Sequence, residues 1–417
     1  MFLAMKRYLF GLFALVGIMC TGCSNDDNDT PSPPVEPMAP EVPIEFSASE
    51  LQAARETENF SYAFFKAVNS NAQQGNVLVS PMNAQLLLAM VANIADENGR
   101  EEIVRTLGCR DLNALNSLCS KYMKAFPKAD GKVKMALANS VWHHNAFDIN
   151  PMFEQRLDES FGADVFKFDF SADPQAVVDA INKWCAGNTD NIIDRIIDQY
   201  SQDMVALLAN AMLFKGQWSK PFDAADTRNA TFHGSRGNTT VSMMHTNISK
   251  SPYIEGDGYS ALNLNFGNGE VYCTWLVLPD EGTDMDAFVG SFDGTSLQLA
   301  QSQRMEVELA LPRFKFATGE IDLINVLGSM GINSIFTPGK LDLFTTPCTG
   351  KIFVSQKASI EFNEKGAEAG AVTWAGIYDT TAPSDGKVSM SFDRPFLFFI
   401  NERQSGACLM AGKITDL

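Results

Sequence analysis

The sequence predicts an α+β fold, because helix-forming patterns dominate its first half and strand-forming patterns its second half. Phe60, Phe64 and Phe65 recur at helical spacing, and Ser80-Pro81 places a capping serine before a first-turn proline. From about residue 205 onward, segments that alternate or run apolar follow one another. Helices first and mostly antiparallel strands later are typical of the α+β class.

The individual elements follow in chain order from the same patterns. Residues 60–68 form the first expected helix. The helix that starts at Ser80-Pro81 is apolar nearly all round, so we expect it to be buried and to end at Asn98-Gly99. Further helices are expected at residues 100–107, 151–161, 174–197 (in segments) and 321–330. Strands are expected at residues 133–142, 163–170, 205–214, 240–244, 259–266, 272–278, 306–316, 352–362, 392–400 and 407–414.

Residues 1–22 have the pattern of a secretory signal. Lys6 and Arg7 give a basic start, an apolar run over residues 8–19 follows, and the small pair Thr21-Gly22 precedes Cys23. The apolar run is too short to span a membrane. A small pair before a cysteine resembles the lipobox of bacterial lipoproteins, which implies a diacylglycerol anchor on Cys23. An ordinary secreted protein with an incidental cysteine is the alternative.

Residues 23–44 are expected to be a tether. Aspartates at 26, 27 and 29 precede six prolines between residues 31 and 43, and this composition cannot bury a core and favours extended chain. The acidic run resembles signals that send lipoproteins to the outer surface of some Gram-negative bacteria, with a plain solvated spacer as the alternative. We expect an exported protein, lipid-anchored in the outer membrane at the cell surface, or otherwise periplasmic or secreted.

Residues 45–417 read as one large domain, with no second linker and no internal repeat. The net charge of −18 argues against a nucleic-acid partner, because phosphate binding needs clustered Lys and Arg. The cysteines of this domain show no metal-site spacing, and they leave a Cys109–Cys119 disulfide open. No nucleophile elbow, phosphate-binding loop or zinc helix is present in the sequence, so neither an enzyme nor a cofactor is expected.

The most informative segment runs from Asn363 to Tyr378. It is long, rich in Ala and Gly, and lies between strand-like segments, whereas connections in compact domains are usually far shorter. Every second residue from Ala367 to Ile377 is small to medium in size and uncharged, so an extended chain would present one face able to pack on a core. The segment has the composition of a strand that has not yet joined a sheet. A flexible surface linker is the alternative.

Several motifs, in order, resemble the serpin family over nearly all of the chain after the tether. They lie at residues 76–83, 161–170, 181–192, 210–222, 311–314, 330–332, 364–366 and 392–396. Asn210-Ala-Met-Leu-Phe-Lys-Gly-Gln-Trp-Ser-Lys-Pro-Phe222 is among the most distinctive of them. The resemblance implies the serpin fold: a mostly helical N-terminal half packed on a large mixed or antiparallel main sheet, further strands, and an exposed reactive-centre loop at about residues 364–391.

The resemblance also implies a suicide inhibitor of proteases that has no catalytic residues of its own. A protease cuts the loop, and the cut loop then inserts into the main sheet while the acyl-enzyme is still attached, which leaves a 1:1 covalent complex. Gly366 gives the backbone freedom at the turning point, and small side chains lower the barrier to passage between strands. The hinge implied by the resemblance comprises Glu364, Gly366, Ala367, Glu368, Ala369 and Ala371.

The bond that the protease cuts is expected between residues 378 and 384. Counting forward from Glu364 places the cut residue at Thr380, and counting back from Pro395 places it near Ser384, so Thr381 and Ala382 are candidates too. Small residues suit elastase-like or subtilisin-like serine proteases, Tyr378 would suit a chymotrypsin-like enzyme, and papain-like cysteine proteases stay open. A non-inhibitory serpin (carrier, chaperone or sacrificial substrate) is the alternative function.

The resemblance further implies a set of sheet-opening positions: Ser80, Asn83, Asn210, Trp218, Arg313 and Gln356. Asn83 and Gln356 stand where the family often has Ser and His, although the Gln356 amide could still donate to Asn210. Arg313 and Glu364 are expected to pair near the top of the main sheet, where Trp218 packs. We expect a monomer that reaches a membrane only through its lipid anchor.

Overall fold

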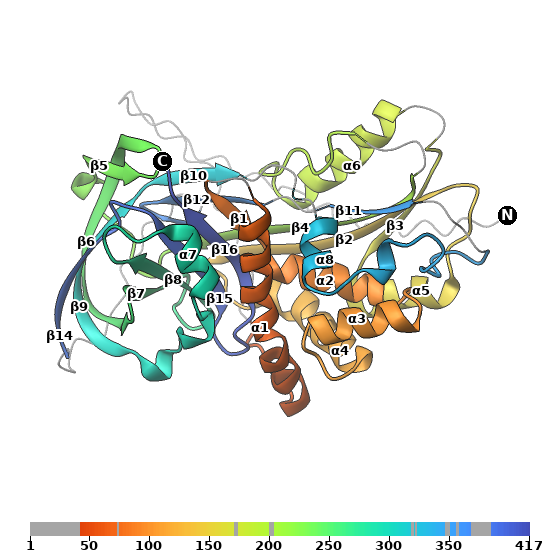
Figure 1. The fold of residues 1–417 in the computed structure, drawn as a ribbon, viewed down its shortest axis with the longest axis horizontal. Helices are drawn as coiled ribbons and strands as arrows, with labels where there is room; N and C mark the ends of the chain where they lie inside the picture. The colour runs from red at the N-terminus through yellow and green to blue at the C-terminus, as the bar shows by residue number, and fades with distance from the viewer. Residues whose placement is uncertain are drawn as a thin grey trace, which may run out of the picture. The chain divides into compact units, whose positions relative to one another are not determined.

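The described part of the chain folds into helices and two β-sheets, which confirms the predicted α+β class (Figure 1). The structure is a computed structural model and describes residues 42–72, 75–170, 174–199, 204–317, 321, 323–346, 351–355, 358–367 and 385–417. Over these ranges, none of the helices has both the length and the hydropathy needed to cross a bilayer.

The helices of the first half begin where capping side chains are available. Ser47 caps α1 by accepting the N–H of Glu50, and Ser80 caps α2 by accepting the N–H of Asn83. Every residue of α2 is buried, as its apolar composition predicts. The helices are α1 (Ala48–Asn71), α2 (Pro81–Ala92), α3 (Glu97–Thr106), α4 (Leu112–Ala125), α5 (Pro151–Arg156, continued by a π-helical turn Leu157–Phe161), α6 (Pro174–Asn188), α7 (Met285–Ser291) and α8 (Leu323–Ser329). Short 3-10 turns lie at Phe126–Lys128, Ala224–Asp226, Gly294–Ser296, Leu299–Gln301 and Ser334–Phe336.

The sheet that carries the candidate site, which we call the main sheet, is mixed. Its strand order is β10-β12-β13-β4-β2-β3, and β11 pairs parallel with the N-terminal part of β4. Its strands are β2 (Val133–His144), β3 (Asp164–Phe168), β4 (Met204–Gln217), β10 (Phe314–Ala317), β11 (Lys351–Ser355), β12 (Ser359–Asn363) and β13 (Gly366–Ala367).

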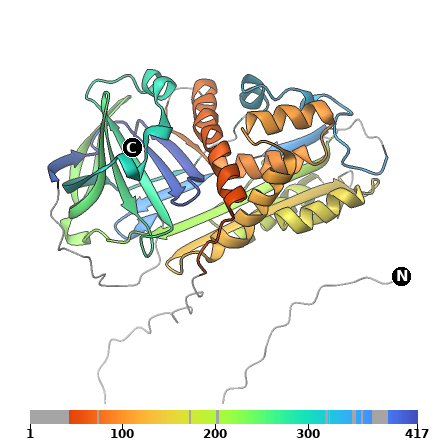
Figure 2. The same ribbon diagram turned by 90° about the horizontal axis from the view of Figure 1, so that it is seen from below.

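The two faces of the main sheet pack on different layers. Met212 and Phe214 of β4 face the large core shared with α1 and α2, whereas Leu207 and Ala209 face α6. This alternation follows the two-residue period of a strand. Figures 1 and 2 show α6 on one side of β2 and β4, and helices α2 to α4 on the other. Any strand that enters the main sheet must therefore fit between two packed layers.

The second sheet contains the C-terminal strands and the mostly antiparallel strands of the second half. Its order is β1-β16-β15-β8-β7-β6-β9-β14, and β5 pairs with β6. Its strands are β1 (Val77–Val79), β5 (Arg228–Gly234), β6 (Gly237–Gly256), β7 (Tyr259–Asn265), β8 (Tyr272–Pro279), β9 (Gln303–Pro312), β14 (Gly386–Ser391), β15 (Phe396–Glu402) and β16 (Cys408–Ile414).

Two element boundaries differ from the sequence prediction for local reasons. The helix that starts at Ser80 ends at Ala92 rather than at Asn98-Gly99, because Asp96 caps a new helix by accepting the N–H of Gly99. The single strand expected over residues 306–316 is two strands, β9 and β10, that belong to different sheets. The chain changes sheet at Pro312, which has no N–H to donate, and at Arg313, whose N–H donates to Ser242 of β6.

One further expectation on the C-terminal side needs correction. The strand expected over residues 352–362 is divided into β11 and β12, which pair with different partners. Within the expected loop range of about 364–391, Gly366–Ala367 and Gly386–Ser391 are paired strands. The patterns also missed α4, α7 and β5. Of these, α7 and β5 are short, whereas α4 buries Leu115, Leu118, Cys119 and Tyr122 at a helical spacing that the sequence prediction overlooked.

Candidate functional site

The candidate site is built around the two-residue strand β13, which lies inside the main sheet. Gly366 and Ala367 pair antiparallel with Gln217 and Gly216 of β4 on one side, and with Asn363 and Phe362 of β12 on the other. The backbone of Gly366 has φ 154°, and a side chain there would meet the carbonyl oxygen of Gly216 at 2.0 Å. Glycine is therefore required where the chain turns into the sheet.

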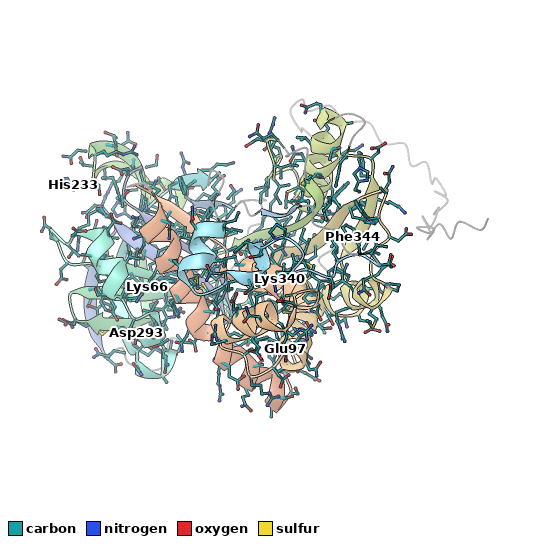
Figure 3. All side chains as sticks on the ribbon, turned by 45° about the vertical axis from the view of Figure 1, so that its right-hand side comes forward. Lys66, Glu97, His233, Asp293, Lys340 and Phe344 are labelled. Atoms are coloured by element: carbon teal, nitrogen blue, oxygen red, sulfur yellow. The ribbon has the colours of Figure 1, made fainter. Side chains whose placement is uncertain are left out.

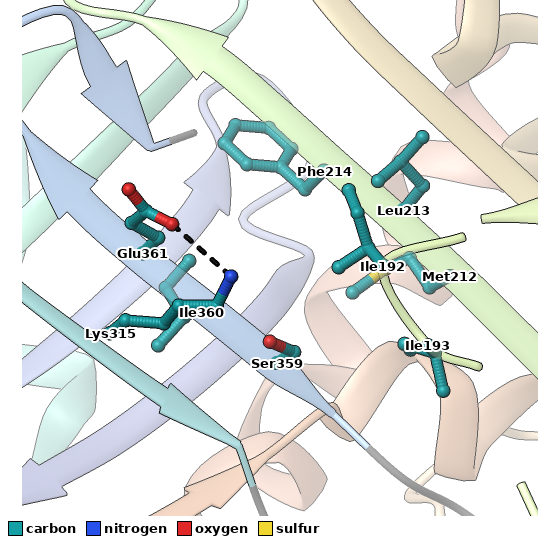
Figure 4. Close-up of a pocket in the computed structure, with 9 residues that line it drawn as sticks. All are labelled: Ile192, Ile193, Met212, Leu213, Phe214, Lys315, Ser359, Ile360 and Glu361. Atoms are coloured by element: carbon teal, nitrogen blue, oxygen red, sulfur yellow. Dashed lines mark ion pairs between the residues drawn. The ribbon is translucent and has the colours of Figure 1, made fainter. Parts of the chain in front are cut away.

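Beyond Ala367, the described strands leave a gap in the main sheet between β4 and β12. The pairing of β4 with β11 ends at Ala209, and its pairing with β13 begins at Gly216. Figure 4 shows the gap, which is lined by Met212, Leu213 and Phe214 of β4, Ser359, Ile360 and Glu361 of β12, and Lys315, Ile192 and Ile193. It holds about 10 Å³ of free space, roughly what one water needs. A strand can enter only if β4 and β12 move apart.

Trp218 packs against the turn that joins β12 to β13. Its indole N–H donates to the Asn363 carbonyl at 2.8 Å, and its ring stacks on Phe266 at a centroid distance of 4.6 Å. The Trp218 backbone N–H donates to the Lys365 carbonyl at 2.8 Å. These contacts fix the tight turn that joins β12 to β13.

Glu364, in that turn, connects the hinge to the neighbouring strands. Its Oε1 atom lies 3.7 Å from Arg313 Nη1 and accepts a hydrogen bond from the Thr227 hydroxyl at 2.9 Å. The Phe222 N–H donates to the Glu364 carbonyl at 2.8 Å. The expected contact between Arg313 and Glu364 is thus present, and side-chain and main-chain contacts both hold the start of the hinge.

A buried polar cluster lies below the gap, on the core face of the main sheet. Ser80 Oγ donates to the Leu409 carbonyl at 2.7 Å, and Asn210 Nδ2 donates to Asn139 Oδ1 at 2.5 Å. The Oδ1 atoms of Asn83 and Asn210 accept no hydrogen bond within the part of the chain that the structure describes. Each of these two buried oxygens can still accept a hydrogen bond, and leaving such an acceptor unsatisfied is costly.

Several predicted site residues lie outside the described residues. Gln356, the expected donor to Asn210, is one of them, and the described partner of Asn210 is instead Asn139. The others are the lipidation candidate Cys23, the hinge residues Glu368, Ala369 and Ala371, and the cut-site candidates Thr380, Thr381, Ala382 and Ser384.

The histidines and cysteines assemble no metal centre among the residues described. His233 of β5 hydrogen-bonds to Asn238 of β6 and lies far from Phe344, against which the His143 ring packs (Figure 3). Within the described ranges no group of His, Cys, Asp and Glu could hold a metal ion. Cys109 and Cys119 are buried free thiols, so the disulfide left open by the sequence is not formed. Burial raises the pKa of both thiols, which keeps them protonated and unreactive.

Sequence reasoning missed three residues that shape the site. Asn139 accepts the hydrogen bond from Asn210. It could have been noticed in the sequence as a polar residue on the apolar face of the strand expected over residues 133–142. Asn363 forms the turn before Gly366 by accepting the N–H groups of Lys365 and Gly366. Ile192 lines the gap from the segment after α6, and no local pattern indicates that placement.

Comparisons with known proteins agree over almost the whole described region. The family model described as "Serpin (serine protease inhibitor)" matches residues 55–417. Serpin-ZX of Arabidopsis thaliana is 28% identical over 371 residues, which cover 84% of this chain and 94% of that protein. A "Serine protease inhibitor" of Cyanea capillata is 29% identical, covering 88% and 98%. The crystal structure of the thermophilic serpin tengpin in its native state matches with a TM-score of 0.78, at 27% identity, and covers 91% of this chain and 97% of that one.

Proposed function

Because this chain belongs to the serpin family, whose members are in general protease inhibitors rather than enzymes, we propose that it is a suicide inhibitor of serine endopeptidases. The protease nucleophile attacks the carbonyl at the cut residue, the amine of the next residue leaves, and an ester joins loop and protease. Insertion of the cut loop into the main sheet then carries the protease away and distorts its active site before water can hydrolyse the ester.

The observation that carries this proposal is the register of β13. Ala367 lies opposite Gly216 of β4 and Phe362 of β12. If the strand continues in the same register, residue 369 lies opposite Phe214 and Ile360. Residue 371 then lies opposite Met212 and Ala358. The gap already visible between β4 and β12 is therefore the path along which the loop would extend.

The residues that would enter this path match its core face. Phe214, Met212 and Ile360 are all buried on the core face of the sheet. Alanine at 369 and 371 adds little volume between them, and a well-packed core tolerates little extra volume. The small residues at every second position after Ala367 would therefore all face the core if the register of β13 continues. Thr373 would arrive beside Asn210, whose Oδ1 atom lacks a described donor.

The proposed target class follows from the residues around the cut site. Thr380, Thr381, Ala382 and Ser384 are small, which suits elastase-like or subtilisin-like enzymes. Lys387 belongs to the paired strand β14, so a trypsin-like enzyme has no basic residue to cut within residues 378–384. Papain-like cysteine proteases form the same kind of acyl-enzyme as a thioester, and they are the second target class to test.

The direct test is a denaturing gel of the domain incubated with an elastase-like, a subtilisin-like, a chymotrypsin-like and a papain-like protease. We expect a band at the summed mass of inhibitor and protease with at least one serine protease. Mass spectrometry of the released peptide then gives the cut residue. Clean cleavage with full protease activity in every case would contradict inhibition and would favour a carrier, chaperone or sacrificial-substrate role.

We also propose that Cys23 carries a diacylglycerol anchor and that the domain is exported to the outer membrane. The support is the signal-like segment before Cys23 and the Asp- and Pro-rich segment after it. Full-length protein expressed in a Gram-negative host is expected to incorporate labelled palmitate, and Cys23→Ala is expected to abolish the label. Cys20→Ala is the matched control and should keep it. Label retained in the Cys23→Ala protein would overturn the anchor.

A further inference from the structure

A second cavity lies against Trp218, and it shares no lining residue with the gap. It is enclosed by the stretch that follows β4, the middle of β6 and the end of β7, and Arg304 of β9 also lines it. Its free volume is about 220 Å³, which is smaller than that of cavities for drug-sized ligands. The size suits a ligand with one or two rings.

An interruption in the pairing of β6 with β9 shapes this cavity. Ile248 of β6 lies opposite Val307, but the next paired residue of β6 is Ser251, which lies opposite Met305. Two residues of β6 therefore oppose one residue of β9, as in a β-bulge. A bulge bends its strand and redirects side chains, and here the whole stretch 248–252 lines the cavity.

The walls of this cavity are positively charged. Lys220, Lys250 and Arg304 line it, and none of the described residues around it is an aspartate or a glutamate. This is unusual in a chain with 50 acidic and 32 basic residues. The Lys220 ammonium donates to the Asn247 carbonyl, which leaves further donors of that ammonium for a ligand. The Asp385 carboxylate approaches Arg304, but its 2.8 Å contact is to the main-chain N–H.

Apolar side chains form the rest of the wall. Trp218, Phe222 and Leu264 are buried in the protein and line the cavity. Binding sites for small molecules typically combine such an apolar lining with a few polar groups that orient the ligand. A neutral ring would leave the cations unused, and an inorganic anion would leave the aromatic wall uncovered. The lining therefore fits a ligand that has both an apolar ring and a negative charge.

We propose that this cavity binds a small aromatic carboxylate. The ring packs against Trp218 and Phe222, and the carboxylate faces Lys220 and Arg304. The site is separate from the gap, and it assumes neither insertion of the loop nor inhibition of a protease.

The aromatic wall also gives the site a link to the hinge. The main-chain N–H of Trp218 donates to the Lys365 carbonyl, and that of Phe222 donates to the Glu364 carbonyl, each at 2.8 Å. A ring packed against Trp218 and Phe222 has to leave before this segment can open. Hydrogen exchange at these two N–H groups therefore reports whether the cavity is occupied.

Isothermal titration calorimetry of the full chain with three probes tests the site. Indole-3-acetate has the ring and the charge, indole-3-acetamide has the same shape without the charge, and acetate has the charge without the ring. Each exposed charge contact contributes up to about fivefold in affinity. With two such contacts, we expect indole-3-acetate to bind about tenfold more tightly than the amide. Acetate is expected to give no measurable binding at the same concentrations.

Variants of the two cations separate the site from a general charge effect. Lys220→Met and Arg304→Met are each expected to weaken indole-3-acetate about threefold and to leave indole-3-acetamide unchanged. Lys387→Met is the matched control, because Lys387 is an exposed cation of β14 that pairs with Glu306 at 3.2 Å and does not line the cavity. It should leave the binding of both probes unchanged. Circular dichroism of each variant confirms that it is folded.

Hydrogen exchange locates the bound probe. With indole-3-acetate at about ten times its Kd, exchange of the Trp218 and Phe222 N–H groups is expected to slow about tenfold, because the open segment cannot hold the ligand. Unchanged exchange at both groups would place the probe elsewhere and overturn the site.

The remaining outcomes are equally decisive. No measurable binding of indole-3-acetate, or equal affinities for the acid and the amide, overturns the proposal. A loss of affinity in Lys387→Met as large as that in Lys220→Met means a general charge effect, and it overturns the proposal as well. A covalent protease complex formed by the same preparation leaves suicide inhibition in place in each of these cases.

Discussion

Replacing Ala367 with arginine is expected to turn this protein from an inhibitor into a substrate. The Ala367 side chain is fully buried in the main sheet, between Gly216 and Phe362. An arginine there must either bury an unpaired charge, which costs several kcal/mol, or keep the hinge out of the sheet. Each 1.4 kcal/mol added to the insertion barrier slows insertion tenfold, so we expect covalent complex to fall at least ~100-fold, while cleavage of the loop continues.

A matched variant shows whether burial or added charge is responsible. Ser389→Arg places the same side chain on an exposed position of β14, at the other end of the loop. This residue does not enter the main sheet during insertion, so the Ser389→Arg protein should form complex at the native rate. The quantity to compare is the number of inhibitor molecules consumed per protease molecule inactivated. Undiminished complex with Ala367→Arg would refute the role of β13 as the leading edge of the inserting strand.

Much of the fold could be predicted from sequence because its signals are local. At the start of α2, the Ser80 side chain caps the helix and the Pro81 ring restricts the backbone to a helical φ angle. The burial of that helix follows from its apolar composition. The errors arose where tertiary contacts decide. The chain changes sheet at Pro312 and Arg313 because Ser242 of β6 offers a carbonyl there, and nothing in the alternating pattern of residues 306–316 shows that partner.

Local sequence patterns predicted parts of the candidate site, but they did not predict its contacts between segments that are distant in sequence. The alternation from Ala367 onward indicates a strand, whereas the packing of Trp218 near Arg313 and Glu364 was expected only through the family resemblance. Lys134, Asp190 and Lys215 are isolated charges in three separate segments, and the fold brings Asp190 Oδ2 to 2.6 Å from Lys134 Nζ and 3.4 Å from Lys215 Nζ. They become a bridge once the register of β2 with β4 is fixed, and a single sequence does not contain that register.

Cutting the loop is expected to raise the melting temperature of the protein by roughly 13 °C. The cut loop can then pair with both β4 and β12 through the gap, and each backbone hydrogen bond adds about 1 kcal/mol. On the order of 10 kcal/mol of added stability corresponds to a shift of roughly this size in a large domain. Differential scanning calorimetry of protein before and after limited cleavage within residues 378–384 measures it.

The size of this shift decides between an inhibitor and a passive substrate, because only a loop that inserts gains stability when it is cut. Ala371→Pro is the control. If the inserted strand keeps the register of β13, position 371 would face Met212 and Ala358, and a proline in such a central strand removes a ladder hydrogen bond. Cut Ala371→Pro protein should gain much less than cut native protein. A native protein that gains nothing after cleavage would show that the gap between β4 and β12 stays closed, and a non-inhibitory role would then account better for the loop.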